Sequence, residues 1–322
     1  MIVKTNRRLW MLCICFMTAI WAAMTRYVFV FCMASALLAA ITESNVAFAQ
    51  TKKTESVAKY LIPGDKPYPT DKAPKAVKSL IQDGTITLVF NSDPEFVKRD
   101  TGKAHYYLGL TQKYGYSFSK AKKDDVWQVK VVAKQVEPTV RIEHVVRLPS
   151  KYKTDTVWNG RLLRHEFDHI AISLDPRPVL LLEHLCRSLP PLKRALEPGE
   201  EPSDAVYKRI INEEITLRRE AVENLIQANY VLLDQVSTHG KVPIPKRAEF
   251  FGKLFTKENL AEQNFPYVDA VLDLLNFPEY QQAELRFLPR DPTEPAGAKV
   301  SATDSAQRRT IRFRIALASS GI

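Results

Sequence analysis

A pentapeptide near the middle of the chain constrains the fold more than any other feature. HEFDH occupies residues 165–169, inside the stretch LLRHEFDHIAISLD of residues 162–175. Apolar residues recur around it at intervals of three and four, as on a helix with one face against a core. These residues are Leu163, Phe167, Ile170 and Leu174. The pattern predicts a buried amphipathic helix.

The polar residues of the pentapeptide have the spacing of a metal site. On a helix that turns about 100° per residue, His165 and His169 project from one face one turn apart, so both imidazoles reach one ion. Glu166 is rotated by about 100°, which places its carboxylate beside the ion, where it can accept a proton from water. This is the H-E-x-x-H pattern typical of zinc metallopeptidases. It predicts one Zn²⁺ per chain; the alternative is two structural histidines on a buried helix.

A catalytic zinc usually has three protein ligands and one water, so a third ligand is expected. Asp175 lies ten residues after His165, as in metzincins, but Ile172 stands where they have Gly, and every Met lies at or before residue 33. Other candidates lie on a long helix predicted to begin at the N-cap Ser203 and to end before Gly240. They are Glu213, Glu214, Glu220, Glu223 and His239. His184, in the predicted helix 179–188, is a further candidate.

The stretch from Val146 to Ile170 resembles a family of predicted secreted bacterial zinc-dependent proteases, first catalogued as a domain of unknown function. Leu148-Pro149, Trp158 and Leu163 precede the H-E-x-x-H, as in that family. The family also carries an Asp-x-x-Thr-x-His-Gly element, and a similar element ends the long helix here. It consists of Asp234, Ser237, His239 and Gly240, with Ser in place of Thr.

The resemblance covers about residues 85–240 and implies a zincin-like fold with His239 as the third zinc ligand. Asp234 is then a candidate to fix the tautomer of an imidazole, or an ordinary surface acid. Asp168 departs from the family, which usually has Gly at that position.

Residues 1–49 have the features of an export leader. Lys4, Arg7 and Arg8 precede two apolar runs, 9–24 and 27–41, each shorter than the roughly 20 residues of a membrane span. The second run is followed by Ala47-Phe48-Ala49, an A-x-A site for signal peptidase. We therefore predict a signal peptide, with Met24 as an alternative start, and a periplasmic or secreted protein. An uncleaved membrane anchor is the alternative.

Composition agrees with export. Cys186 is the one cysteine beyond the leader, so an internal disulfide is excluded there and a hydrophobic core must stabilise the chain. The formal charge of the whole chain is +10. This favours contact with an anionic envelope surface. Export and the scattered basic residues argue against nucleic acid as a partner.

The rest of the chain predicts an α+β fold. Residues 50–76, rich in Lys, Pro and Thr, are expected to form a linker, and 286–322 a low-complexity tail. Between them, residues 77–285 would form one zincin-like domain with a small, mainly antiparallel sheet and later helices. Strands are expected at 85–90, 106–118, 125–134 and 139–148, with turns near 113–115 and 135–138. Helices are expected from Asp155, at 179–188, from Ser203, and at 250–265 and 267–275.

Together these features predict an exported zinc metallopeptidase. Its substrate would be a peptide or protein of the cell envelope, or a related amide, held along an exposed strand. Glu166 would act as general base, and Tyr230 and His184 are candidate donors to the oxyanion. Two alternatives remain: an inactive or structural zinc-binding envelope protein, and an envelope-binding module without metal.

Overall fold

The computed structural model describes residues 57–99, 101–153 and 155–283. The predicted leader and tail lie outside these residues. By its contacts the described chain divides into two compact units. We call residues 111–139 with 186–216 the hairpin unit, and residues 57–110, 140–185 and 217–283 the helical unit. No helix in the described ranges is both long and apolar enough to cross a membrane.

The fold is α+β, as predicted, with a mixed five-stranded sheet. β1 pairs antiparallel with β2, and β2 pairs parallel with β4, so the sheet is not simply antiparallel. β3 flanks β4 at the end of the order β1-β2-β4-β3, and β5 pairs antiparallel with β4 elsewhere along its length. The strands are β1 (Asp65–Pro67), β2 (Ile86–Asn91), β3 (Lys103–Lys123), β4 (Val126–Pro149) and β5 (Leu192–Ala195).

β3 and β4 are single long strands, so both predicted internal turns are wrong. β3 continues through Gly115 without interruption. In β4 the predicted turn is a bulge, because Gln135 adopts a left-handed conformation with φ of 50° and the strand then goes on. Val129 and Val131 are buried before the bulge, and Val136 after it. The bulge therefore exchanges the faces on which odd and even residues lie.

The turn that joins β3 to β4 is Asp124-Asp125. Both residues have positive φ, 50° and 62°. A two-residue turn with left-handed geometry at both positions matches the twist of an antiparallel hairpin, and Asp tolerates this conformation better than most residues. The strand predicted to begin at residue 125 therefore begins correctly, within one residue of β4. The strand predicted at 106–118 is shorter than β3.

The helix with HEFDH is α4 (Arg161–Ser173). The predicted start at Asp155 is instead a 3-10 helix, η3 (Asp155–Asn159), and Gly160 in extended conformation separates the two. α5 (Pro176–Arg187) follows directly, because Asp175 before Pro176 leaves the helical conformation. α6 (Asp204–Ser237) is the predicted long helix, and the Ser203 hydroxyl accepts a hydrogen bond from the Val206 amide at 3.4 Å.

The core of the helical unit confirms the apolar face of α4. Leu163, Phe167 and Ile170 are buried against Leu88 and Leu148 of the sheet. Each such side chain stabilises the fold by roughly 1.5–3 kcal/mol. This packing fixes the orientation of α4 about its axis, and so the direction of its polar side.

The described part of the predicted linker belongs to this unit. β1 lies within it, and Asp65 forms a buried ion pair with Arg147 of β4, Oδ2 to Nη2 at 2.7 Å. Burial would raise the pKa of Asp65, but Arg147 and further hydrogen bonds outweigh it and hold that pKa below its usual value. The remaining elements before α4 are η1 (Val57–Tyr60), α2 (Lys75–Gln82), α3 (Pro94–Arg99) and η2 (Ser150–Tyr152).

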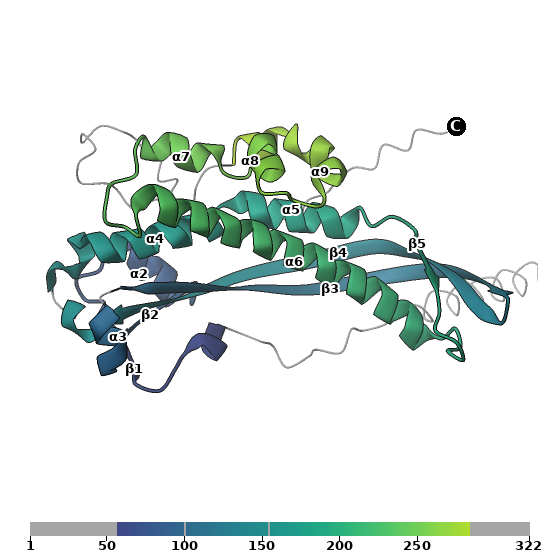
Figure 1. Ribbon diagram of the computed structural model, residues 1–322, viewed down its shortest axis with the longest axis horizontal. Coiled ribbons are helices and arrows are strands. Elements are labelled where there is room, and N and C mark those ends of the chain that lie inside the picture. The colour runs from purple at the N-terminus through teal and green to yellow at the C-terminus, as the bar shows by residue number, and fades with distance from the viewer. Residues whose placement is uncertain (1–56, 100, 154, 284–322) are drawn as a thin grey trace, which may run out of the picture. The chain divides into compact units, whose positions relative to one another are not determined.

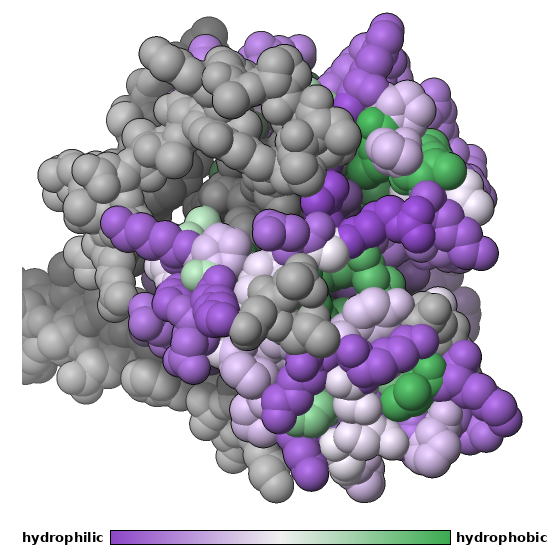
Figure 2. Space-filling model, turned by 90° about the vertical axis from the view of Figure 1, so that its left-hand side faces the viewer, coloured by the Kyte–Doolittle hydropathy of each residue, from purple (hydrophilic) through white to green (hydrophobic). Residues whose placement is uncertain are grey.

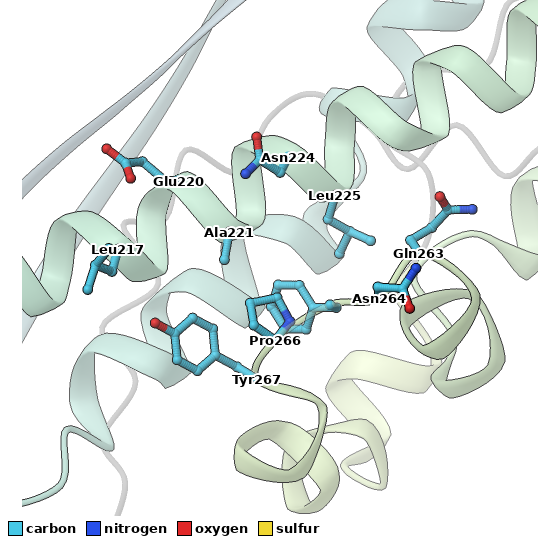
Figure 3. Close-up of a pocket in the computed structure, with 10 residues that line it drawn as sticks. Leu217, Glu220, Ala221, Asn224, Leu225, Gln263, Asn264, Pro266 and Tyr267 are labelled. Atoms are coloured by element: carbon cyan, nitrogen blue, oxygen red, sulfur yellow. The ribbon is translucent and has the colours of Figure 1, made fainter.

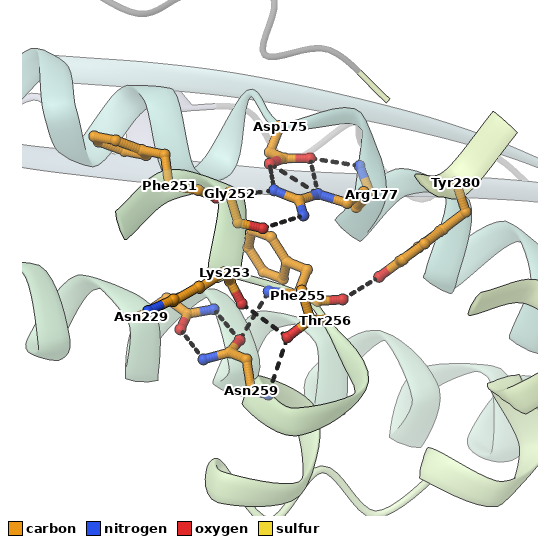
Figure 4. A network of polar contacts seen from close by, with 10 residues as sticks. All are labelled: Asp175, Arg177, Asn229, Phe251, Gly252, Lys253, Phe255, Thr256, Asn259 and Tyr280. Carbon is orange, nitrogen blue, oxygen red and sulfur yellow. Dashed lines mark hydrogen bonds and ion pairs between the residues drawn. The ribbon is translucent and has the colours of Figure 1, made fainter. Parts of the chain in front are cut away.

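After α6 the chain forms short helices, and the predicted helix 250–265 is divided. Phe255 has φ of 59°, and Thr256 then caps a new helix by accepting from the Asn259 amide. Arg177 at the start of α5 pairs with Asp175 and donates to the carbonyls of Phe251 and Gly252 (Figure 4). The helices are α7 (Arg247–Lys253), α8 (Lys257–Glu262), α9 (Val268–Leu275) and α10 (Pro278–Gln281), and Figure 1 shows their order.

Candidate metal centre

Three side chains of the helical unit converge on one point. His165 and His169 of α4 direct their Nε2 atoms toward each other, 3.3 Å apart. Asp234 of α6 places Oδ1 3.0 Å from His165 Nε2 and 3.2 Å from His169 Nε2. Within the described residues this is the group of His, Cys, Asp and Glu whose ligand atoms are close enough to hold one metal ion.

The three distances fit a zinc ion. Zinc binds His nitrogen and carboxylate oxygen at about 2.0–2.2 Å with tetrahedral angles, so two of its ligand atoms are about 3.3–3.6 Å apart. The observed separations of 3.0, 3.2 and 3.3 Å form a triangle of nearly this size. Two imidazole nitrogens and one carboxylate oxygen are also a donor set that zinc accepts.

Hydrogen bonds around His165 favour the tautomer that a metal requires. The hydroxyl of Ser237 donates to the Leu233 carbonyl at 2.7 Å, and its oxygen accepts from the Gly240 amide at 3.0 Å. The same oxygen lies 3.5 Å from His165 Nδ1. Since the hydroxyl proton is already used, Nδ1–H is the donor of that contact. In the neutral imidazole the lone pair is then on Nε2, where a metal can bind, and in the protonated imidazole Nε2–H donates to Asp234 instead.

His169 is held by packing rather than by a hydrogen bond on its far nitrogen. Its Nδ1 is buried and has no hydrogen-bond partner among the described residues. The imidazole lies against the ring of Tyr230, with centroids 4.6 Å apart. The Tyr230 hydroxyl is 2.8 Å from Ser173 Oγ, which is 2.6 Å from His144 Nε2. A buried polar chain therefore fixes the ring that supports His169.

The charges at this centre favour a cation. Burial would lower the pKa of His165, but the neighbouring Asp234, Glu166 and Asp168 outweigh it and raise that pKa. For Asp234, burial acts to raise the pKa, while hydrogen bonds from both imidazoles hold it well below its usual value. Asp234 is therefore ionised at any physiological pH, and its negative charge points at the two nitrogens.

Glu166 lies beside the three converging atoms. Its side chain is buried, and burial raises its pKa despite the two nearby histidines. The Ala104 amide, at the start of β3, donates to its carboxylate. Gly102 makes room for it, because a Cβ atom there would lie 2.5 Å from Glu166 Oε1. A carboxylate with a raised pKa next to a metal position is suited to accepting and returning a proton.

The segment after α6 has an unusual backbone. Thr238, His239 and Gly240 have φ of 48°, 52° and 71°, three consecutive residues in the left-handed region. Non-glycine residues adopt this conformation at a cost of about 1–2 kcal/mol each, and such strain is concentrated at functional sites. A Cβ atom at Gly240 would lie 2.6 Å from His165 Cγ, so only glycine allows this close approach.

This strained turn places His239 beside Asp234 but outside the converging group. His239 Nδ1 is 3.6 Å from Asp234 Oδ1, and the His239 side chain is 71 % exposed. The structure thus brings the predicted third ligand to the edge of the centre, while Asp234 takes the place next to both histidines. Sequence reasoning identified Asp234 only as a supporting residue; its position four residues before the turn was the available signal.

Asp168, the departure from the family pattern, forms a buried ion pair with Arg247 of α7. Burial raises the pKa of Asp168 although Arg247 and the two histidines act in the opposite direction. The Arg247 guanidinium also lies over the Phe251 ring, 5.1 Å from its centroid. Asp168 therefore links α4 to the start of α7 through this ion pair and is not directed at the metal position.

The other candidate ligands have other partners. Asp175 pairs with Arg177, and His184 Nε2 lies 3.1 Å from the Ala270 carbonyl. Neither joins the converging group, and neither does any candidate glutamate of α6. Three of those glutamates, Glu213, Glu214 and Glu223, form ion pairs with Arg209, Arg194 and Arg219. Tyr230, a candidate oxyanion donor, is buried behind His169 and bonded to Ser173.

A separate concavity of about 430 Å³ lies between α6 and residues 263–267. Leu217, Ala221 and Leu225 of the helix face Pro266 and Tyr267 across it (Figure 3). Its lining includes no residue of the metal centre.

No family model matches the chain, and neither a curated protein nor a solved structure matches it significantly.

Proposed function

We propose that the chain is an exported zinc-dependent hydrolase of zincin-like fold that cleaves peptide or related amide bonds. The observation that carries the proposal is the triangle of His165 Nε2, His169 Nε2 and Asp234 Oδ1, with Glu166 alongside. We propose these three atoms as the zinc ligands, with Asp234 in the place that the family resemblance gives to His239. Export is inferred from the leader of residues 1–49.

In this proposal the zinc ion and Glu166 have separate roles in hydrolysis. When bound, zinc would lower the pKa of a water molecule toward neutrality and polarise the carbonyl of the substrate. Glu166 accepts the proton of the attacking water and returns it to the leaving amine. The Ala104 amide and the space at Gly102 hold its carboxylate in place. His239 lies exposed next to Asp234.

The position of β3 supports a peptide as substrate. Glu166 contacts residues 102–104, where β3 begins, and β3 is the terminal strand in the order β1-β2-β4-β3. A strand with one unpaired edge can add an extended peptide through main-chain hydrogen bonds, with little dependence on its side chains. We propose a peptide or protein of the cell envelope, bound along β3 with its scissile bond near Glu166.

The exposure of the centre favours a catalytic ion over a structural one. A structural zinc is normally enclosed by four protein ligands, whereas a catalytic zinc keeps one position open. Here Asp234 is 28 % exposed, and the two residues that could have closed the site, Asp175 and His184, are bonded elsewhere. The alternative of a binding module without metal does not account for two imidazole nitrogens 3.3 Å apart.

The experiment is cleavage of a mixed peptide library by the full chain, followed by mass spectrometry, with and without a zinc chelator. Glu166→Gln removes the general base and should reduce the rate by at least about 100-fold with zinc content unchanged. Gly102→Ala adds a methyl group where Glu166 Oε1 lies and should displace the same carboxylate, also without zinc loss. Full activity of Glu166→Gln would refute the proposal.

A further inference from the structure

A lysine-rich face of the hairpin unit is the feature that the hydrolase proposal leaves unexplained. Along β3, the even-numbered residues before the turn face α6: Tyr114 donates to Asn212 at 2.9 Å, and Phe118 stacks on Tyr207 with centroids 4.2 Å apart. Because side chains alternate along a strand, odd-numbered residues of β3 lie on the opposite face. Lys113 and Lys123 are therefore on the face away from α6, and both are exposed.

The neighbouring strands add three more lysines to this face. In β4, Trp127 lies under Lys120 and Lys122, which are even-numbered residues of β3, so odd-numbered residues of β4 before the bulge share the α6 side. Lys130 and Lys134 therefore lie opposite. In β5, Lys193 is the register partner of Lys130 and shares its face. All five lysines are exposed, and none forms an ion pair with a described residue.

The pairing of Lys130 with Lys193 indicates that the face meets an anion. Residues directly opposite on antiparallel strands have Cβ atoms about 5 Å apart, and like charges in this arrangement destabilise a sheet. Up to Lys134, the residues of this face on β3, β4 and β5 include no Asp or Glu that would compensate. The acids nearest in sequence are Asp124 and Asp125 at the turn, Glu137 beyond the bulge and Glu197 two residues after β5.

The extent of the face favours a partner with a wide surface. On this face of β3 the residues between Lys113 and Lys123 are Gly115, Ser117, Ser119 and Ala121, so no large side chain projects from that strand there. Lys113 and Lys123 are ten residues apart, about 33 Å along a strand. Lysines spread over this length and over three strands match a wide anionic surface, whereas a single narrow polymer strand would reach only some of them.

We propose that this lysine face, Lys113, Lys123, Lys130, Lys134 and Lys193, is a peripheral binding surface for anionic phospholipid bilayers. The headgroup phosphates would supply the counter-charge that the like-charged pair lacks. Each lysine near an anionic bilayer contributes on the order of 1 kcal/mol, and the attraction weakens as salt rises. This inference does not depend on the metal centre.

The test is co-sedimentation of the full chain with phosphatidylglycerol–phosphatidylcholine vesicles and with pure phosphatidylcholine vesicles. Replacing the five lysines by Thr, which suits strands, should weaken binding to the anionic vesicles by roughly 100-fold or more. The matched control replaces five exposed lysines of the helical unit and should change binding by less than about threefold. These are Lys66, Lys75, Lys98, Lys241 and Lys257. Every variant keeps the same leader, so any contribution of the leader cancels.

Lys193→Glu is the sharper variant. It converts the like-charged pair with Lys130 into an attractive one, so the melting temperature should rise while binding to anionic vesicles falls by roughly tenfold or more. Unchanged vesicle binding in both lysine variants would overturn the proposal. So would binding to soluble polyphosphate or DNA, lost with the five lysines, without binding to anionic vesicles, because the partner would then be a different polyanion.

Discussion

Two glycines leave space for side chains of the proposed centre. Gly102 leaves space for the carboxylate of Glu166, and Gly240 leaves space for the imidazole of His165. Neither position could be predicted from sequence as a contact, because each glycine is far along the chain from its neighbour on α4. The H-E-x-x-H pattern describes the donors but not the backbone that surrounds them.

Gly240→Ala should impair zinc binding more than it impairs folding. The new methyl group requires a strained φ of +71° and would lie 2.6 Å from His165 Cγ, so the imidazole must move. We expect zinc affinity to fall at least about tenfold, as for loss of a residue that orients a ligand. Zinc competition with a chromophoric chelator measures this.

Gly199→Ala is the matched control for that variant. Gly199 also has a positive φ, +84°, but no atom lies within 4 Å of the added Cβ. It should destabilise the fold by about 1 kcal/mol and leave zinc affinity unchanged. Equal zinc affinities for the two variants would show that Gly240 is needed only for its backbone conformation.

His144 should make stability depend on pH. It is buried, and burial lowers its pKa from 6.5 to about 4 against the raising effect of its hydrogen bond to the Thr85 carbonyl. The unfolded chain therefore binds more protons between pH 6.5 and 4. The free energy of unfolding should decrease as pH falls through this range, by up to about 3 kcal/mol in total.

His144→Gln should reduce that pH dependence, whatever its effect on stability at neutral pH. Urea unfolding at pH 6.5, 5.5 and 4.5 gives the slope for both chains. A contribution with the same sign remains from His105, whose pKa is also lowered to about 4, by burial and by nearby Lys103 and Arg147. An identical slope in parent and variant would mean that His144 is not buried in its neutral form.

The long strands β3 and β4 show which elements can be read from sequence. Their β-branched and aromatic content predicted strands in the right places, and the Ser203 cap and the Asp175-Pro176 break predicted helix ends correctly. The interior turns were wrong: β3 continues through Gly115, and at Gln135 β4 bulges without reversing direction, which the sequence there does not signal. β5 was not predicted, since its LKRA sequence becomes a strand only by pairing with β4.

Gln135→Gly should stabilise the protein. Glycine adopts φ of 50° without the steric cost that Gln bears there, so we expect a gain of about 1 kcal/mol despite the greater flexibility of the unfolded chain. Lys134→Gly, one residue earlier in regular strand, should instead destabilise by about 0.5–1 kcal/mol. Chemical denaturation compares them; destabilisation by both changes would contradict the bulge geometry.

Across the molecule, local spacing and tertiary placement contribute different parts of the proposed centre. His165, Glu166 and His169 share one helix, so their geometry follows from helical periodicity alone. Asp234 lies 69 residues from His165 and reaches it only because α6 packs beside α4. Figure 2 shows a described surface that is mostly hydrophilic, with several separate apolar areas.

Zinc stoichiometry is the most direct test of the proposed metal centre. Purified full chain should bind one zinc ion, measured by elemental analysis after dialysis, and Glu166→Gln should keep it. His169→Ala and Asp234→Ala should each weaken zinc binding by at least about 100-fold, since each removes a direct ligand. His239→Ala should retain the ion. Loss of zinc in His239→Ala together with retention in Asp234→Ala would contradict the proposed ligand set, and a parent chain without zinc would contradict the metal centre itself.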